Sequence, residues 1–179
     1  MIHRSGTRTG AAAIALTALA LGACASRPNE SSAPELVVGE VDRAGFAADA
    51  NGVFERRCGS LDCHGQLPRG LRIYGANGLR LPNDAGLVPG GGATTPAEIA
   101  ANYDSIVGLQ PDQMNAFLLK TPRTEDDARH LLVLAKPLAL ERHKGGTSLS
   151  LGEPAEQCIV TWLLGHADHE LCAKASRLP

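Results

Sequence analysis

Two cysteines and a histidine lie close together in this chain, in the segment Cys58-Gly-Ser-Leu-Asp-Cys63-His64. A partner bound by both cysteines would fix the backbone between them, so this segment constrains the fold more than any other. Side chains of this kind and spacing can form a small disulfide loop, part of a zinc site, or an attachment site for c-type haem. The direct adjacency of Cys63 and His64 favours haem, because a thioether and an iron–imidazole bond can then form on one porphyrin face.

The interval between the two cysteines is wider than the usual one. Four residues separate them, where haem attachment usually has two. Gly59 and Ser60 can bulge outward while the Cys58 sulfur still reaches the second vinyl group. Zinc stays open but lacks a second ligand pair, because the later cysteines are far apart in sequence. A plain disulfide between Cys58 and Cys63 also stays open, although the adjacent histidine weighs against it.

The N-terminus has the pattern of an export signal. Arg4 and Arg8 precede an apolar run over residues 11–23 that is too short to span a bilayer comfortably. This predicts a signal peptide over residues 1–23. Its end, Leu-Gly-Ala-Cys, resembles the lipobox of bacterial lipoproteins, which implies lipidation at Cys24. An ordinary secreted protein cleaved nearby is the alternative.

The predicted anchor places the protein in the cell envelope, facing the periplasm. No aspartate follows Cys24, and this favours the outer membrane over retention at the inner one. Residues 24–41 then form a lipidated tether without a periodic apolar face, and residues 42–179 form one domain. The chain carries 17 Lys and Arg against 19 Asp and Glu. We expect no nucleic-acid partner, because no basic run is present to contact phosphates.

The last two cysteines are predicted to form a disulfide. With the others assigned to lipid and haem, Cys158 and Cys172 remain as a pair in an oxidising compartment. On one straight helix their Cα atoms would lie about 21 Å apart. That separation is far beyond disulfide reach, so the chain must reverse, and Gly165 is the candidate turn.

Apolar spacing and helix-start residues predict an all-α domain, a small bundle of helices with long loops around one haem. Residues 71–81 are a candidate extended piece, and residues 82–94 are rich in proline and glycine and are predicted as loop. The helices are expected to begin at a capping residue or a proline. Their predicted ranges are 42–57, 95–107, 111–121, 124–136 and a last helix that opens at Pro154.

With these features the chain resembles a class I c-type cytochrome over roughly residues 43–166. In that family a helix leads into the haem motif and a C-terminal helix packs across it. The resemblance implies thioether bonds at Cys58 and Cys63 and His64 as the proximal iron ligand. The segment from residue 138 to 146 also resembles a variant group with a histidine–glycine–glycine loop before the final helix.

The distal iron ligand has two candidates. In the family it is most often a methionine between the middle and last helices, and Met114 lies early in that interval. His143 lies in the expected stretch, where Gly145 and Gly146 would let the backbone approach a bulky porphyrin. We therefore predict His143, with Met114 as the alternative, because filling a core is the more usual role of such a methionine.

Two axial protein ligands would leave no open iron position for a substrate, and the function that remains is one-electron transfer. We expect an electron carrier with no catalytic residue, one covalent haem c, and redox partner proteins in the periplasm or membrane. An iron that is open on one side would instead indicate a gas sensor or a peroxidase-like enzyme. A cofactor-free lipoprotein held by two disulfides is the structural alternative.

Overall fold

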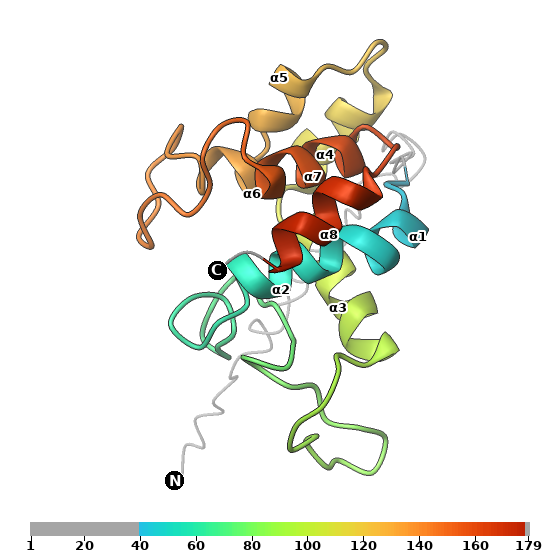
Figure 1. The fold of residues 1–179 in the computed structure, drawn as a ribbon, viewed down its shortest axis with the longest axis vertical. Coiled ribbons are helices and arrows are strands. Elements are labelled where there is room, and N and C mark those ends of the chain that lie inside the picture. Colours follow the sequence, from blue (N-terminus) through green and yellow to red (C-terminus); the bar gives the residue numbers. More distant parts are fainter. Residues whose placement is uncertain (1–39, 178–179) are drawn as a thin grey trace, which may run out of the picture. The chain divides into compact units, whose positions relative to one another are not determined.

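Helices joined by long loops make up the described part of the protein, residues 40–177 of this computed structural model (Figure 1). In that range the extended segment after the cysteine motif forms only an isolated bridge, between Tyr74 and Leu79, and no strand. The all-α prediction is therefore confirmed for this part of the chain. The helical elements are α1 (Arg43–Gly45), η2 (Phe46–Ala50), α2 (Asn51–Arg57), α3 (Pro96–Val107), α4 (Pro111–Leu119), α5 (Glu125–Arg129), α6 (Leu132–Ala135), α7 (Pro154–Leu163) and α8 (His169–Arg177).

A continuous helical segment made of α1, η2 and α2 leads into the cysteine motif, as predicted. Asp42 caps its start, because its Oδ1 accepts a hydrogen bond of 2.8 Å from the Gly45 amide. The middle of the segment, η2, is π-helical. Cys58 occupies the C-cap position, and its amide donates to the Phe54 carbonyl at 2.9 Å. The first cysteine is thus fixed by the end of a helix.

Capping residues define the middle helices. Thr95 and Thr124 each form a capping box with the acid three residues later, and both helix starts are confirmed. The predicted helix over residues 124–136 is instead divided into α5 and α6. Leu131 adopts an extended conformation between them, and the Gln110 side chain accepts a hydrogen bond of 2.7 Å from the Leu132 amide. A side chain from a neighbouring segment therefore replaces the helical bond that would have joined the two parts.

The C-terminal part is a helical hairpin closed by a disulfide. Cys158 on α7 and Cys172 on α8 are bonded, with their Cα atoms 4.9 Å apart. Gly165 makes the reversal with a φ of 88°, which favours glycine. The sequence predicts the bond and the turn, whereas it predicts α7 as the last helix and misses α8. Figure 1 shows α7 and α8 beside each other.

The N-terminal segment and α7 meet in an aromatic core. The rings of Phe46 and Trp162 lie 5.1 Å apart between centroids, and Phe54 and Tyr103 pack against both. The Trp162 indole donates to the Asp42 carbonyl at 2.8 Å. Val41 is already buried in this core. The start of the domain is therefore held against its last third, and residues 40–177 belong to one compact unit.

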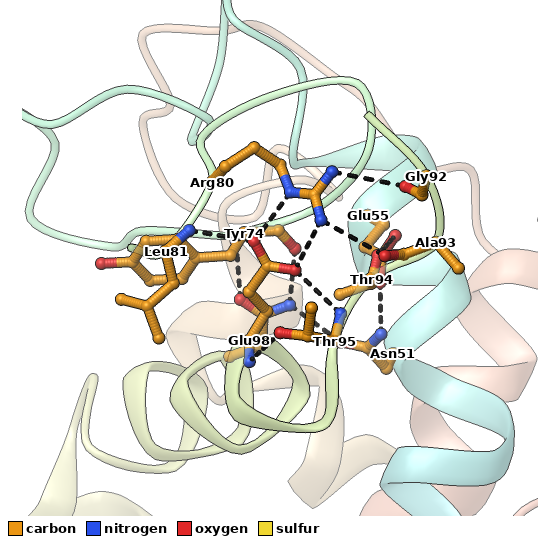
Figure 2. A network of polar contacts seen from close by, with 11 residues as sticks. Asn51, Glu55, Tyr74, Arg80, Leu81, Gly92, Ala93, Thr94, Thr95 and Glu98 are labelled. Carbon is orange, nitrogen blue, oxygen red and sulfur yellow. Dashed lines mark hydrogen bonds and ion pairs between the residues drawn. The ribbon is translucent and has the colours of Figure 1, made fainter. Parts of the chain in front are cut away.

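A buried polar network anchors the long loop that follows the motif to α2 and α3 (Figure 2). Arg80 Nε donates to Glu98 Oε1 at 2.7 Å, and the Leu81 amide donates to the same oxygen at 2.9 Å. Burial by itself would raise the pKa of Glu98, but hydrogen bonds from Arg80 and two backbone amides outweigh it and lower that pKa to about 2. Glu98 is therefore ionised at neutral pH and paired with Arg80.

No helix among residues 40–177 is long and apolar enough to cross a membrane. The predicted signal peptide, Cys24 and the tether up to residue 39 lie outside the described residues.

Candidate functional site

The cysteine motif folds into a tight loop directly after α2. The His64 amide donates to the Cys58 carbonyl at 2.9 Å, so the two ends of the motif are joined. Within the loop, the amides of Cys63 and Gly65 both donate to the Ser60 carbonyl, at 3.0 and 2.9 Å. The four intervening residues are thus accommodated by a turn that brings the first cysteine next to the histidine.

Both motif cysteines are free thiols in this structure, and both are partly buried. Burial raises the pKa of Cys58 to about 12, and the nearby Cys63 adds to this shift while Arg57 opposes it. Cys58 therefore stays a neutral thiol at neutral pH. The structure bonds Cys158 to Cys172 but leaves Cys58 and Cys63 available for another partner.

His64 has one ring nitrogen held by the backbone and the other left over. Its Nδ1 lies 3.0 Å from the Leu71 carbonyl oxygen. A carbonyl can only accept, so in this contact Nδ1 carries the hydrogen and Nε2 keeps its lone pair. Burial lowers the pKa of His64, the Leu71 bond opposes that shift, and the neighbouring His143 and Arg69 add to it. The neutral imidazole that results is the form that binds metal.

His143 has the same arrangement on the loop between α6 and α7. Its Nδ1 lies 2.8 Å from the Gly146 carbonyl oxygen, which again leaves Nε2 as the free nitrogen. Gly146 has a φ of 73°, a left-handed conformation that favours glycine. A Cβ at Gly145 would lie 3.2 Å from Cε1 of the His143 ring, so a side chain there would crowd it. Both glycines thus have a local role in placing His143.

The structure brings the two histidines together. Their ring centroids lie 6.1 Å apart and their planes differ by 7°. Metal–imidazole bonds of about 2 Å, with each ring centre roughly 1.1 Å behind its nitrogen, would separate two axial rings by about 6 Å across one ion. The observed spacing fits that requirement. The distance between the His64 and His143 rings thus agrees with the one that an iron between two imidazoles would need.

Met114, the other distal candidate, lies in the hydrophobic core. It sits on α4 with 3% of its surface exposed and belongs to the same buried cluster as Phe117 and Trp162. This is the core-filling role that is usual for methionine on an amphipathic helix. The ring that lies next to His64 is that of His143.

Large apolar side chains are exposed on both histidine loops. Leu61 and Leu67 flank His64 with 60% and 66% of their surface exposed, and Leu140 and Leu151 flank the His143 loop with 60% and 72%. Single exposed leucines are ordinary, and these four have in common that they lie close in sequence to His64 or His143. A flat apolar group bound between the loops would cover such side chains.

The site has a further part that sequence reasoning missed, the carbonyl of Leu71 and the residues that hold it. Backbone groups leave no mark in the sequence, so the only available signal was the extended character of residues 71–81. Among residues 40–177, the candidate site included, no three or more His, Cys, Asp or Glu side chains are gathered in a way that could hold a metal ion.

Comparison with known proteins gives no relative: no family model, curated protein or solved structure matches this chain.

Proposed function

We propose that this protein is a membrane-anchored electron carrier that holds one covalent haem c. The observation that carries the proposal is the pair of near-parallel imidazoles, 6.1 Å apart, each with Nδ1 bound to a backbone carbonyl. A core histidine packed for stability has no need of this arrangement, whereas two axial ligands require a free Nε2 on each ring. The free thiols of Cys58 and Cys63 add the means of attachment.

We infer that the domain is an elaborated class I cytochrome c-like fold. The helical segment that ends at Cys58 packs against α7 through Phe46 and Trp162, which is the helix pairing that the family uses. The additions are α8, its disulfide to α7, and the longer interval between the motif cysteines. Each addition lies outside the contact between the two histidines.

The roles of the residues follow from their positions. Cys58 and Cys63 would form the two thioether bonds, His64 would be the proximal ligand and His143 the distal one. Haem held in this way supplies a one-electron redox centre. Two imidazoles on the iron leave no open position, which favours electron transfer over catalysis. The Leu71 and Gly146 carbonyls fix the rings and raise the basicity of the ligand nitrogens.

The location and partners of the protein rest on the sequence. The signal pattern over residues 1–23 and the cysteine at position 24 support a lipid anchor, the periplasm-facing side of the envelope and, in preference, the outer membrane. Electron exchange there would be with other redox proteins of the periplasm or membrane.

Production in a host with a cytochrome c maturation system tests the proposal. Haem should survive acid–acetone extraction, because thioether bonds are covalent, and a pyridine haemochrome spectrum should report two thioethers. Cys58→Ser is the matched control, which should retain haem through Cys63 alone and shift that spectrum toward one thioether. Complete extraction of haem from the wild type would overturn the proposal. Ready binding of carbon monoxide by the reduced wild type would indicate an open iron, and hence a sensor or peroxidase-like protein.

A further inference from the structure

Residues 71–74, which contact His64, are hydrogen-bonded to side chains of α3. Asn102 contacts both backbone polar groups of Tyr74: its Oδ1 accepts from the Tyr74 amide at 2.6 Å, and its Nδ2 donates to the Tyr74 carbonyl at 2.8 Å. This pair of bonds fixes the orientation of one peptide segment, as a neighbouring strand would do. A helix side chain thus replaces the strand that the segment lacks.

A second contact from α3 holds the same segment two residues earlier. Ser105 Oγ accepts from the Arg72 amide at 3.2 Å. Asn102 and Ser105 are three residues apart and therefore lie on one face of the helix. Together they fix the segment over residues 72–74.

The opposite side of this segment contacts His64. The Ile73 amide donates to the His64 carbonyl at 3.0 Å, and the Leu71 carbonyl accepts from His64 Nδ1 at 3.0 Å. Ile73 is fully buried. Residues 71–74 are thus pinned between α3 and His64, with hydrogen bonds on both sides.

Asn102 has no freedom to rearrange. It is fully buried, and its Nδ2 also donates to Asn51 Oδ1 on α2 at 2.9 Å. Rotation of the amide by half a turn would set its NH₂ against the Tyr74 amide and its oxygen against the Tyr74 carbonyl. We call the hydrogen bonds from Asn102 and Ser105 to residues 72–74 the clamp. The Asn102 amide has one possible orientation in this clamp, and it is also bonded to α2, the helix that leads into Cys58.

We propose that Asn102 and Ser105 are positioning residues for His64: they hold residues 71–74 so that the Leu71 carbonyl accepts the Nδ1 hydrogen and directs Nε2 to its ligand role. This inference rests on the proposed function for its effect on haem. A ligating imidazole whose Nδ1–H is hydrogen-bonded is a stronger electron donor, and stronger donation stabilises the oxidised iron. Loss of the clamp should therefore make the midpoint potential more positive.

Three measurements on the mature chain test the inference. Ser105→Ala and Asn102→Ala should speed hydrogen exchange at the Ile73 amide roughly two- to tenfold, the range that the net value of one supporting hydrogen bond implies. The ¹⁵N shifts of the His64 ring should move away from those of a single Nδ1–H tautomer. In the haem-loaded chain, both variants should also raise the midpoint potential.

Two control variants separate positioning from general stability. Ser105→Thr keeps the accepting oxygen and should keep the wild-type potential. Thr161→Val removes a hydroxyl that accepts from the Asp168 amide at 3.1 Å, in the turn after α7, and should leave both the His64 ring and the potential unchanged. Unchanged His64 shifts and potential in Ser105→Ala would overturn the inference, as would an equal change in Thr161→Val. A chain that never binds haem would defeat the proposed function alone, because exchange and ring shifts still decide the positioning role.

Discussion

Replacement of His143 should change the visible spectrum but hardly the stability, whereas replacement of Met114 should lower the stability and leave the spectrum unchanged. His143 lies on a loop, and within residues 40–177 the hydrogen bond of its ring is to the Gly146 carbonyl of the same loop. In the chain without haem, His143→Ala should therefore cost no more than about 1 kcal/mol, the net value of one hydrogen bond. Met114 is 3% exposed in the core, so Met114→Ala should cost about 2–5 kcal/mol.

Urea titration of the unloaded chain measures the first half of this prediction. With a denaturant slope of about 2 kcal/mol per molar, Met114→Ala should lower the unfolding midpoint by about 1–2.5 M, and His143→Ala by about 0.5 M or less. The visible spectrum of the haem-loaded chain measures the second half. There, His143→Ala should turn the ferric iron high-spin and let the ferrous form bind carbon monoxide, whereas Met114→Ala should stay low-spin.

One pair of results would refute the reasoning. A low-spin His143→Ala together with a high-spin Met114→Ala would transfer the distal role to Met114. A ferric absorption band near 695 nm in the wild type, which marks methionine ligation in cytochromes of this kind, would agree with that outcome. The spacing of the two rings would then have no part in ligation.

Three other changes should have defined effects. Cys24→Ser should release the protein from membrane fractions, because it removes the thiol that we propose carries the lipid. Retention in membrane fractions without detergent would contradict the proposed anchor. Replacement of both Cys158 and Cys172 by alanine should lower the free energy of unfolding by about 3 kcal/mol in urea titrations, and an unchanged midpoint would show that the hairpin holds without its bond. The depressed pKa of Glu98, about 2 against an ordinary 4.5, means that its ionised form stabilises the fold above about pH 4.5 and that this contribution is lost as the pH falls toward 2. Melting temperatures of Glu98→Gln should therefore vary less than those of the wild type between pH 5 and 2, and parallel curves would disprove the assignment.

Local signals in the sequence predicted those parts of the fold that depend on local chemistry. The capping boxes at Thr95 and Thr124 and the turn at Gly165 needed only neighbouring residues, and all three are confirmed. The break at Leu131 depends on Gln110, a residue far away in sequence, and could not be predicted. α8 has few buried side chains, and its sequence signal was the capping aspartate Asp168, whose Oδ1 accepts from the Leu171 amide.

In the candidate site too, features that depend on neighbouring residues could be predicted, and features that depend on distant residues could not. The sequence itself contains the adjacency of Cys63 and His64 and the glycines after His143. These features led to the two histidines whose rings lie near each other in the structure. The clamp on residues 71–74 consists of side chains bonded to backbone groups about thirty residues away. An asparagine and a serine on a helix have no pattern that marks such a role, so only the structure could reveal it.

The disulfide between α7 and α8 also decides which cysteines of the described domain pair with each other. In the oxidising compartment that the proposed export implies, any two of the four thiols in the described domain could be joined, and only a bond between Cys158 and Cys172 leaves both motif thiols free. The hairpin brings Cys158 and Cys172 together through a single local turn and then buries both sulfurs. Short-range closure of this kind does not depend on the rest of the domain being folded. Topology alone can thus remove one pair of cysteines from exchange early and leave Cys58 and Cys63 as free thiols.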